Sequence, residues 1–90
     1  DPKYAEAYNN LAIVHGQMGQ LDKAYQSVQK AIELQPGYAK AHFNLAEWFY
    51  RQGQLSESQA TLLQAIELDP EFFEAYNRLG RIFLEQGKRS

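Results

Sequence analysis

The sequence predicts an all-α protein built from a repeated pair of helices. Residues 5–38 align with residues 39–72 without a gap, and the two segments are identical at 13 of 34 positions. The residues that recur at this step are Pro2, Pro36 and Pro70, Gly19, Gly53 and Gly87, and Leu11, Leu45 and Leu79. Apolar residues inside each segment follow helical spacing rather than the alternation of strands. A fixed period of this length indicates a solenoid that uses one structural unit repeatedly.

The first repeat predicts two helices, at residues 4–18 and 22–34. Tyr8, Leu11, Ala12 and His15 form one apolar face of the first helix. Gly19 is expected to end it, because glycine accepts the left-handed conformation of a C-terminal cap. Asp22 is a suitable N-cap for the second helix. Pro36 ends that helix, since the residue before a proline is driven out of the helical region.

The remaining chain predicts three more helices in the same register, at residues 38–52, 56–68 and 72–86. Gly53 and Gly87 are expected to end the first and last of these. Ser56 is expected to cap the helix at 56–68, where Ser56 and Gln59 have the spacing of a capping box. Five helices are therefore expected.

These positions resemble the tetratricopeptide repeat, whose pattern places aromatic, leucine, small and proline residues at set places in 34. The matching residues are Tyr8, Leu11, Ala12, His15, Ala24, Val28 and Pro36 in the first repeat, His42, Leu45, Ala46, Phe49, Ser58, Leu62 and Pro70 in the second, and Tyr76, Leu79, Gly80 and Phe83 in the third. Histidine replaces an aromatic residue at His15 and His42, and serine replaces alanine at Ser58. The resemblance implies one domain over residues 1–90, with repeats at 5–38 and 39–72 and the first helix of a third within 73–90. It also implies an α-α superhelix, a right-handed solenoid of antiparallel helix pairs whose first helices line a concave groove.

Composition narrows the functional classes. The chain has a formal net charge of -2, 44% hydrophobic residues and no cysteine, so we expect neither a nucleic-acid surface nor a disulfide framework. No apolar run reaches the roughly 18 residues of a membrane span. We expect a soluble segment of a longer array, because the chain lacks an initial methionine and opens on a dipeptide that elsewhere closes a repeat. The compartment stays open, with the cytoplasm favoured.

No group of residues predicts catalysis, a metal or a cofactor. His15 and His42 occupy aromatic core positions and lack partners at zinc-ligand spacing. Trp48 aligns with Val14 and Ile82, which favours a role in the core between repeats. Gly16 aligns with Tyr50 and has two open interpretations, a tolerated surface glycine or a point where a ligand approaches closely.

The predicted site is the face of the first helices that the core does not need. It comprises Asn9, Asn10, Ile13, Lys40, Phe43, Asn44, Glu47, Tyr50, Arg51, Asn77, Arg78 and Arg81. Asn10 and Asn44 lie one repeat apart and resemble the asparagine ladder with which some tetratricopeptide arrays hold a peptide backbone, although Arg78 interrupts it. Phe43 and Tyr50 offer aromatic surface to a bound side chain. The alternative is that the asparagines are ordinary solvated residues and the aromatics cover a neighbouring helix.

A second use of the family, the carboxylate clamp for a peptide's C-terminus, fits poorly. Asn44 and Arg78 match its residues, but Glu74, Asn9 and Ile13 stand where the resemblance implies lysine, lysine and asparagine. The leading hypothesis is therefore a non-enzymatic module that binds an extended peptide or protein segment without strong net charge. The alternatives are a structural spacer that self-associates through exposed repeat ends, and an accessory repeat region of a larger enzyme.

Overall fold

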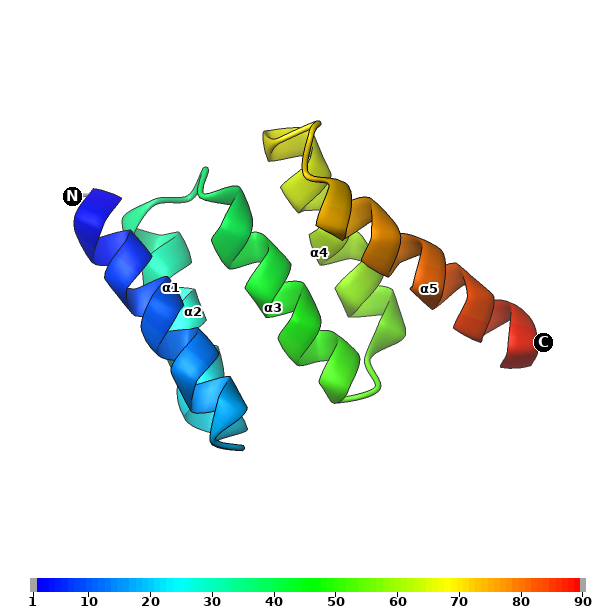
Figure 1. Cartoon of the computed structure of the whole chain (residues 1–90), viewed down its shortest axis with the longest axis horizontal. Helices are drawn as coiled ribbons and strands as arrows, with labels where there is room; N and C mark the ends of the chain where they lie inside the picture. Colours follow the sequence, from blue (N-terminus) through cyan, green and yellow to red (C-terminus); the bar gives the residue numbers. More distant parts are fainter. Residues whose placement is uncertain (1, 90) are drawn as a thin grey trace.

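A computed structural model describes residues 2–89 of the chain (Figure 1). Its helices are α1 (Pro2–Gln17), α2 (Leu21–Leu34), α3 (Ala39–Arg51), α4 (Leu55–Leu68) and α5 (Phe73–Arg89). Residues 2–89 contain five helices and no strand, as the periodicity predicts. No helix in this range is both long and apolar enough to cross a membrane.

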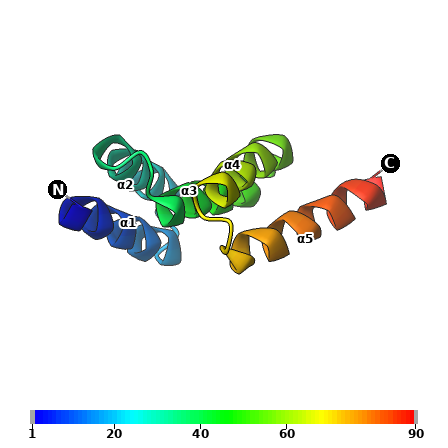
Figure 2. The same cartoon turned by 90° about the horizontal axis from the view of Figure 1, so that it is seen from above.

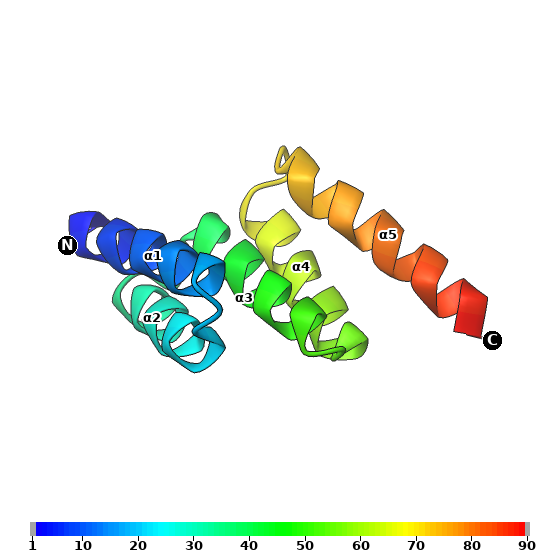
Figure 3. The same ribbon diagram turned by 60° about the horizontal axis from the view of Figure 1, so that its bottom comes forward.

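The helices stack as antiparallel pairs in two layers. α1 pairs with α2 and α3 with α4, while α2 contacts α3 and α4 contacts α5. Seen from above, α1, α3 and α5 form one layer and α2 and α4 the other (Figure 2). A further view places α1 and α5 at opposite ends of the molecule, which measures 43 × 29 × 16 Å (Figure 3). The chain therefore forms an α-α superhelix whose first helices share one side.

Gly19 and Gly53 end their helices as predicted. Their φ angles are +76° and +78°, values that residues with a Cβ atom rarely adopt. The N–H of Gln20 donates to the carbonyl of His15 at 2.8 Å, and the N–H of Gln54 donates to the carbonyl of Phe49 at 3.0 Å. These bonds are typical of the Schellman motif, which satisfies carbonyls at a helix end.

The helix end predicted at Gly87 is wrong. Gly87 lies inside α5, which continues to Arg89. Gly19 and Gly53 are followed after one residue by Leu21 and Leu55, which pack back on the stack, and such an apolar contact commonly accompanies the motif. The three residues after Gly87 are polar, so a glycine alone does not stop the helix.

The predicted N-caps are also wrong. α2 and α4 begin one residue early, at Leu21 and Leu55, so Asp22 and Ser56 lie inside the first turn. Gln20 and Gln54 occupy the N-cap positions and make no side-chain capping bond. The capping box of Ser56 and Gln59 is therefore absent. The first helical position is held by a buried leucine in α4 and by a half-buried one in α2, and Asp22 lies near the positive end of the helix dipole, where an acid is favourable.

Two apolar clusters hold the stack together. One joins Ala12 and Ala41 to Val28 and Ala31 of α2, and the other is centred on Leu62 and Ile82. Trp48 packs between the repeats as predicted, with its ring 4.3 Å from that of Tyr25 and its Nε1–H donating to the Leu21 carbonyl at 2.8 Å. Alanines at the contacts let the helix backbones approach closely.

The predicted apolar face of α1 is only partly buried. Ala12 is 5% exposed, but Tyr8 and Leu11 are 36% and 42% exposed. Their counterparts on α3 are His42 and Leu45, and Leu45 packs against the cluster that contains Val28 of α2. α1 has no helix on that side within the described residues, which leaves the same stripe open to solvent.

Candidate functional site

The concave side of α1, α3 and α5 carries three adjoining hollows. The Gly16 hollow, of about 170 Å³, lies between α1, α2 and α3 and is lined by Gly16, Ala24, Val28, Trp48 and Arg51 among others. The central hollow, of about 260 Å³, runs across α1, α3 and the start of α5. The Arg81 hollow, of about 230 Å³, lies between α3 and α5. Ile13 and Asn44 line the first two hollows and Phe43 the last two, so the three hollows are neighbours, and together they are called the groove here.

Eleven of the twelve residues predicted for the site line these hollows. The Gly16 hollow includes Ile13, Asn44, Glu47 and Arg51, the central hollow includes Asn9, Asn10, Ile13, Lys40, Phe43 and Asn44, and the Arg81 hollow includes Phe43, Asn77, Arg78 and Arg81. Tyr50 lines none of the three. Its ring instead packs against the apolar cluster of Leu62 and Ile82.

The asparagines do not form the expected pair of equivalent groups. Asn9 is 2% exposed and faces α3, where its Oδ1 accepts a hydrogen bond from Asn44 Nδ2 at 2.6 Å. The Asn10 side chain is exposed and makes no hydrogen bond within the described residues. The placement of Asn9 on the open face was wrong because it lies at the edge of that sector, where α3 covers it. Asn44 serves first as a bridge between helices.

Glu47 and Arg78 neutralise each other across α3 and α5. Arg78 Nη2 donates to Glu47 Oε2 at 3.0 Å, and Arg78 Nε faces Glu47 Oε1 in the same ion pair. Both side chains are 25% exposed. The Arg78 guanidinium also lies over the Tyr50 ring, 4.9 Å from its centroid. This pair leaves little net charge at the centre of the groove.

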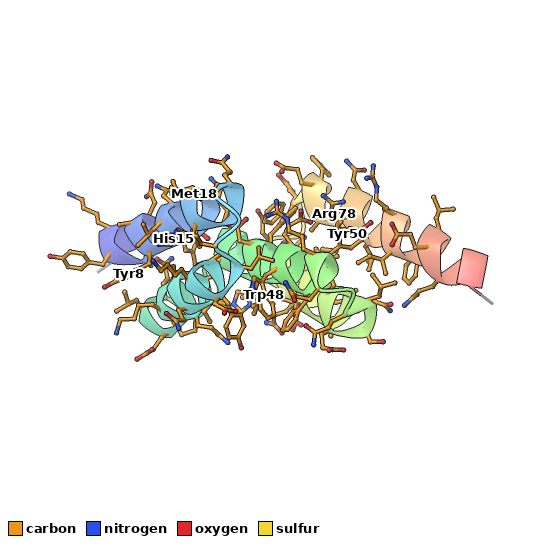
Figure 4. The ribbon with its side chains drawn as sticks, turned by 90° about the horizontal axis from the view of Figure 1, so that it is seen from below. Tyr8, His15, Met18, Trp48, Tyr50 and Arg78 are labelled. Carbon is orange, nitrogen blue, oxygen red and sulfur yellow. The ribbon has the colours of Figure 1, made fainter. Side chains whose placement is uncertain are left out.

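Tyr50 closes the junction between α3 and α5. Its hydroxyl donates a short hydrogen bond to Glu85 Oε1. That bond, burial and the Glu85 charge raise the pKa of Tyr50 above its ordinary value of 10.0, although Arg78 and Arg81 oppose the shift. Figure 4 labels Tyr50 and Arg78, which lie next to each other between α3 and α5. The expectation that Tyr50 offers its ring to a ligand is therefore not supported by its position.

Several charged and apolar side chains remain exposed along the groove. Arg51 makes one long hydrogen bond, from Nη1 to the Gly16 carbonyl at 3.4 Å. Ile13 is 42% exposed and presents apolar surface beside it. Lys40 and Arg81 add positive charge, which Glu6 and Glu74 balance in part.

Both histidines and Ser58 form hydrogen bonds within the fold. His15 Nδ1 pairs with Gln20 Oε1 at 2.9 Å, and His42 Nε2 pairs with the Pro36 carbonyl at 2.8 Å. Ser58 Oγ donates to the Ala46 carbonyl at 2.8 Å in the core. Among the described residues, no three His, Asp or Glu side chains gather as a metal site would require.

The sequence indicated only part of the Gly16 hollow. Sequence reasoning considered close approach of a ligand at Gly16, but it did not predict a hollow that reaches down to Val28 of α2. The available clue was size, because Gly16, Ala24 and Val28 align with Tyr50, Ser58 and Leu62. All three positions are smaller in the first repeat.

Solved structures with similar folds include two crystal structures of MamA. Their TM-scores are 0.88 and 0.86 at 26% identity, and the match covers 97% of this chain but 51% and 48% of theirs. This chain thus spans about half the length of those proteins. The first TPR of Spaghetti (RPAP3), solved bound to the HSP90 peptide SRMEEVD, matches with a TM-score of 0.85 at 26% identity over 100% of this chain and 70% of its own.

The second TPR of Spaghetti, also bound to SRMEEVD, has a TM-score of 0.88 at 21% identity, over 97% of this chain and 81% of its own, and shares the fold. No curated protein sequence matches significantly. A family model described as tetratricopeptide repeat matches residues 3–71, and a second model of that description matches residues 61–88. The chain therefore belongs to the tetratricopeptide repeat family.

Proposed function

We propose that this chain is a non-enzymatic protein-interaction module that binds an extended peptide or protein segment along its concave groove. The position of the three hollows next to one another supports this proposal most directly. They run across α1, α3 and α5 and expose both polar and apolar side chains. Such a surface suits main-chain hydrogen bonding with pockets for alternate side chains.

Groups without internal partners supply the hydrogen bonds in this proposal. The side chains of Asn10, Lys40 and Asn77 make no hydrogen bond with any other described residue. The two amides can both donate to and accept from a peptide backbone. Asn44 contributes less than the sequence suggested, because its amide nitrogen is already bonded to Asn9.

The peptide-bound relative supports a peptide ligand, but the lining argues against the same kind of peptide. The first TPR of Spaghetti holds SRMEEVD, which carries three acidic residues. Here Glu74 contributes a carboxylate to two of the hollows, and Glu47 neutralises Arg78. We therefore propose a ligand without strong net charge.

The test begins with peptides selected from a display library on the intact chain, followed by titration of the selected sequence. Replacing Asn10 and Asn77 together with alanine is expected to weaken binding by about 5-fold to 150-fold, from roughly 0.5 to 1.5 kcal/mol for each hydrogen bond. Gln64→Ala is the matched control, since this exposed amide lies on α4 in the other layer. Equal affinity of the double variant and the native chain contradicts groove binding.

A second candidate function is self-assembly through the two ends of the stack. It is favoured by exposed apolar side chains at the two ends of the stack, namely Leu11 and Val14 on α1, Met18 in the turn after it, and Phe73, Phe83 and Leu84 on α5. The mass of the protein in solution as a function of concentration tests it.

A further inference from the structure

The two complete repeats have different side chains at the same junction of three helices. In the second repeat the Tyr50 ring fills the junction of α3, α4 and α5, against the cluster that contains Leu55, Leu62 and Ile82. Arg78 lies over one side of the ring, and Glu85 accepts the hydroxyl hydrogen bond. The chain thus holds an aromatic side chain at this junction.

The equivalent junction of the first repeat lacks that ring. Gly16 stands 34 positions before Tyr50 and opens the Gly16 hollow, which has a floor of Leu21, Ala24 and Val28. Ala24 and Val28 of the floor are smaller than their counterparts Ser58 and Leu62, whereas Trp48 at the side is larger than its counterpart Ile82. The volume of the hollow, about 170 Å³, exceeds the roughly 150 Å³ of an apolar cavity that accepts benzene.

We propose that the Gly16 hollow receives one aromatic side chain of the bound peptide, which takes the place that Tyr50 takes in the second repeat. This inference rests on the proposed function, because it assigns an anchor residue to a peptide in the same groove. The floor and the flanking Trp48 supply apolar contacts to the ring, and Asn44 holds the position that corresponds to Arg78.

The rim of the hollow favours tyrosine over phenylalanine. The residue that corresponds to Glu85 is Arg51, so a hydrogen-bond donor replaces the acceptor that holds the Tyr50 hydroxyl. Arg51 has five N–H donors, and its only hydrogen bond within the described residues is the long one to the Gly16 carbonyl. A tyrosine hydroxyl can accept from this guanidinium, whereas a phenylalanine ring leaves the donors facing it unused.

The probe is a set of four pools of capped nonapeptides. The central residue is tyrosine, phenylalanine, leucine or alanine, and the other positions are an equimolar mixture of glycine, serine, glutamine, lysine and glutamate. Each pool is titrated into the ¹⁵N-labelled chain. The tyrosine pool is expected to bind at least about 10-fold more tightly than the alanine pool, with amide shifts centred on Gly16 and Ala24.

The decisive variant places a tyrosine side chain of the chain itself in the Gly16 hollow. Gly16→Tyr is expected to weaken the tyrosine pool at least roughly 10-fold while keeping the helical fold, since glycine disfavours helix at this position. Gly80→Tyr is the matched control, because Gly80 lies inside α5, outside the three hollows, with open space around the position of a Cβ atom. Equal binding by the four pools, or unchanged affinity in Gly16→Tyr, overturns the proposal.

A second variant keeps the proposal testable should Gly16→Tyr misfold. The native chain is expected to prefer the tyrosine pool to the phenylalanine pool by a factor between about 2 and 12. Arg51→Ala is expected to bind the two pools almost equally. An unchanged preference contradicts the role of the rim. If the four pools bind equally well and replacing Asn10 and Asn77 weakens all of them, the aromatic anchor is wrong but binding in the groove is retained. If no pool binds, both proposals are wrong.

Discussion

Asn9 and Asn44 illustrate how a polar side chain on a first helix becomes structural. Asn44 Nδ2 donates to Asn9 Oδ1 at 2.6 Å, and Asn9 is almost fully withdrawn from water. A buried acceptor that loses its donor retains its desolvation cost, which is larger than the net value of the bond. The two asparagines that the sequence placed in one ladder, Asn10 and Asn44, therefore differ in their effect on stability.

Replacing Asn44 with alanine is expected to lower the free energy of unfolding by about 1 to 3 kcal/mol, because Asn9 Oδ1 loses its hydrogen bond. Asn10→Ala, at an exposed position, is expected to change it by no more than about 0.5 kcal/mol. Urea unfolding of both variants provides the measurement. Equal stability of the two variants contradicts a structural role for the amide pair.

The Tyr50 hydroxyl makes stability depend on pH at the alkaline end. Its pKa is raised in the folded chain, so the stabilisation is fully present below the ordinary value of 10.0 and is lost as pH rises through the folded value. Tyr50→Phe is expected to lose less stability than the native chain between about pH 8 and pH 11. Urea unfolding at the two pH values measures the difference, and identical losses count against the hydrogen bond to Glu85.

At the scale of elements, glycines at different places in a repeat have different roles. Gly53 adopts a φ of +78° in the turn between α3 and α4, whereas Gly80 lies in the interior of α5 with open space around it. Gly53 allows the chain to reverse into the next helix. Gly80 only adds conformational freedom to the unfolded chain.

Alanine substitutions are therefore expected to act in opposite directions. Gly53→Ala forces a Cβ atom into the left-handed region and should destabilise the fold by roughly 1 kcal/mol. Gly80→Ala should stabilise it by up to about 1 kcal/mol, through helix propensity. Thermal melts of the two variants give the sign directly, and a melting temperature lowered by Gly80→Ala shows that this position packs against another surface.

At the scale of the whole molecule, the two outer helices of the stack leave apolar surface uncovered. Leu11 and Val14 of α1 are 42% and 47% exposed, and Phe73 and Leu84 of α5 are 70% and 69% exposed. A docking surface at one end that differs from the surface at the other gives head-to-tail contacts, which extend rather than close. Concentrated protein is then expected to form open chains of copies.

Leu11→Glu is expected to weaken this association with little effect on the stability of the single chain, because Leu11 is half exposed. The matched control is Leu63→Glu, at 49% exposure on α4. Sedimentation velocity over about 10 µM to 1 mM follows the mass, a range suited to weak contacts of this kind. A mass that stays monomeric throughout, or that falls equally with both variants, contradicts association through the ends.

Local chemistry was enough to determine the number of helices, their order and the turns at Gly19 and Gly53. Each of these depends on residues close in the sequence and on a period that the chain repeats. The same reasoning misplaced the N-caps at Asp22 and Ser56, since it could not weigh a capping bond against the packing of Leu21 and Leu55 on the stack. It also stopped the last helix at Gly87, where the apolar residue that turns the chain back is missing.

Only the packing of α1, α3 and α5 decided which groove residues are exposed. The sequence placed Asn9, Glu47, Tyr50 and Arg78 on the same helical face as Asn10 and Asn77. In the structure Asn9 is buried against α3, Tyr50 packs on the apolar cluster, and Glu47 pairs with Arg78. Whether such a side chain meets solvent or another side chain depends on the distance and angle between helices. A helical wheel contains neither quantity, so the Glu47–Arg78 pair, the buried Asn9 and the hollow beside Gly16 became visible only when the helices were in place.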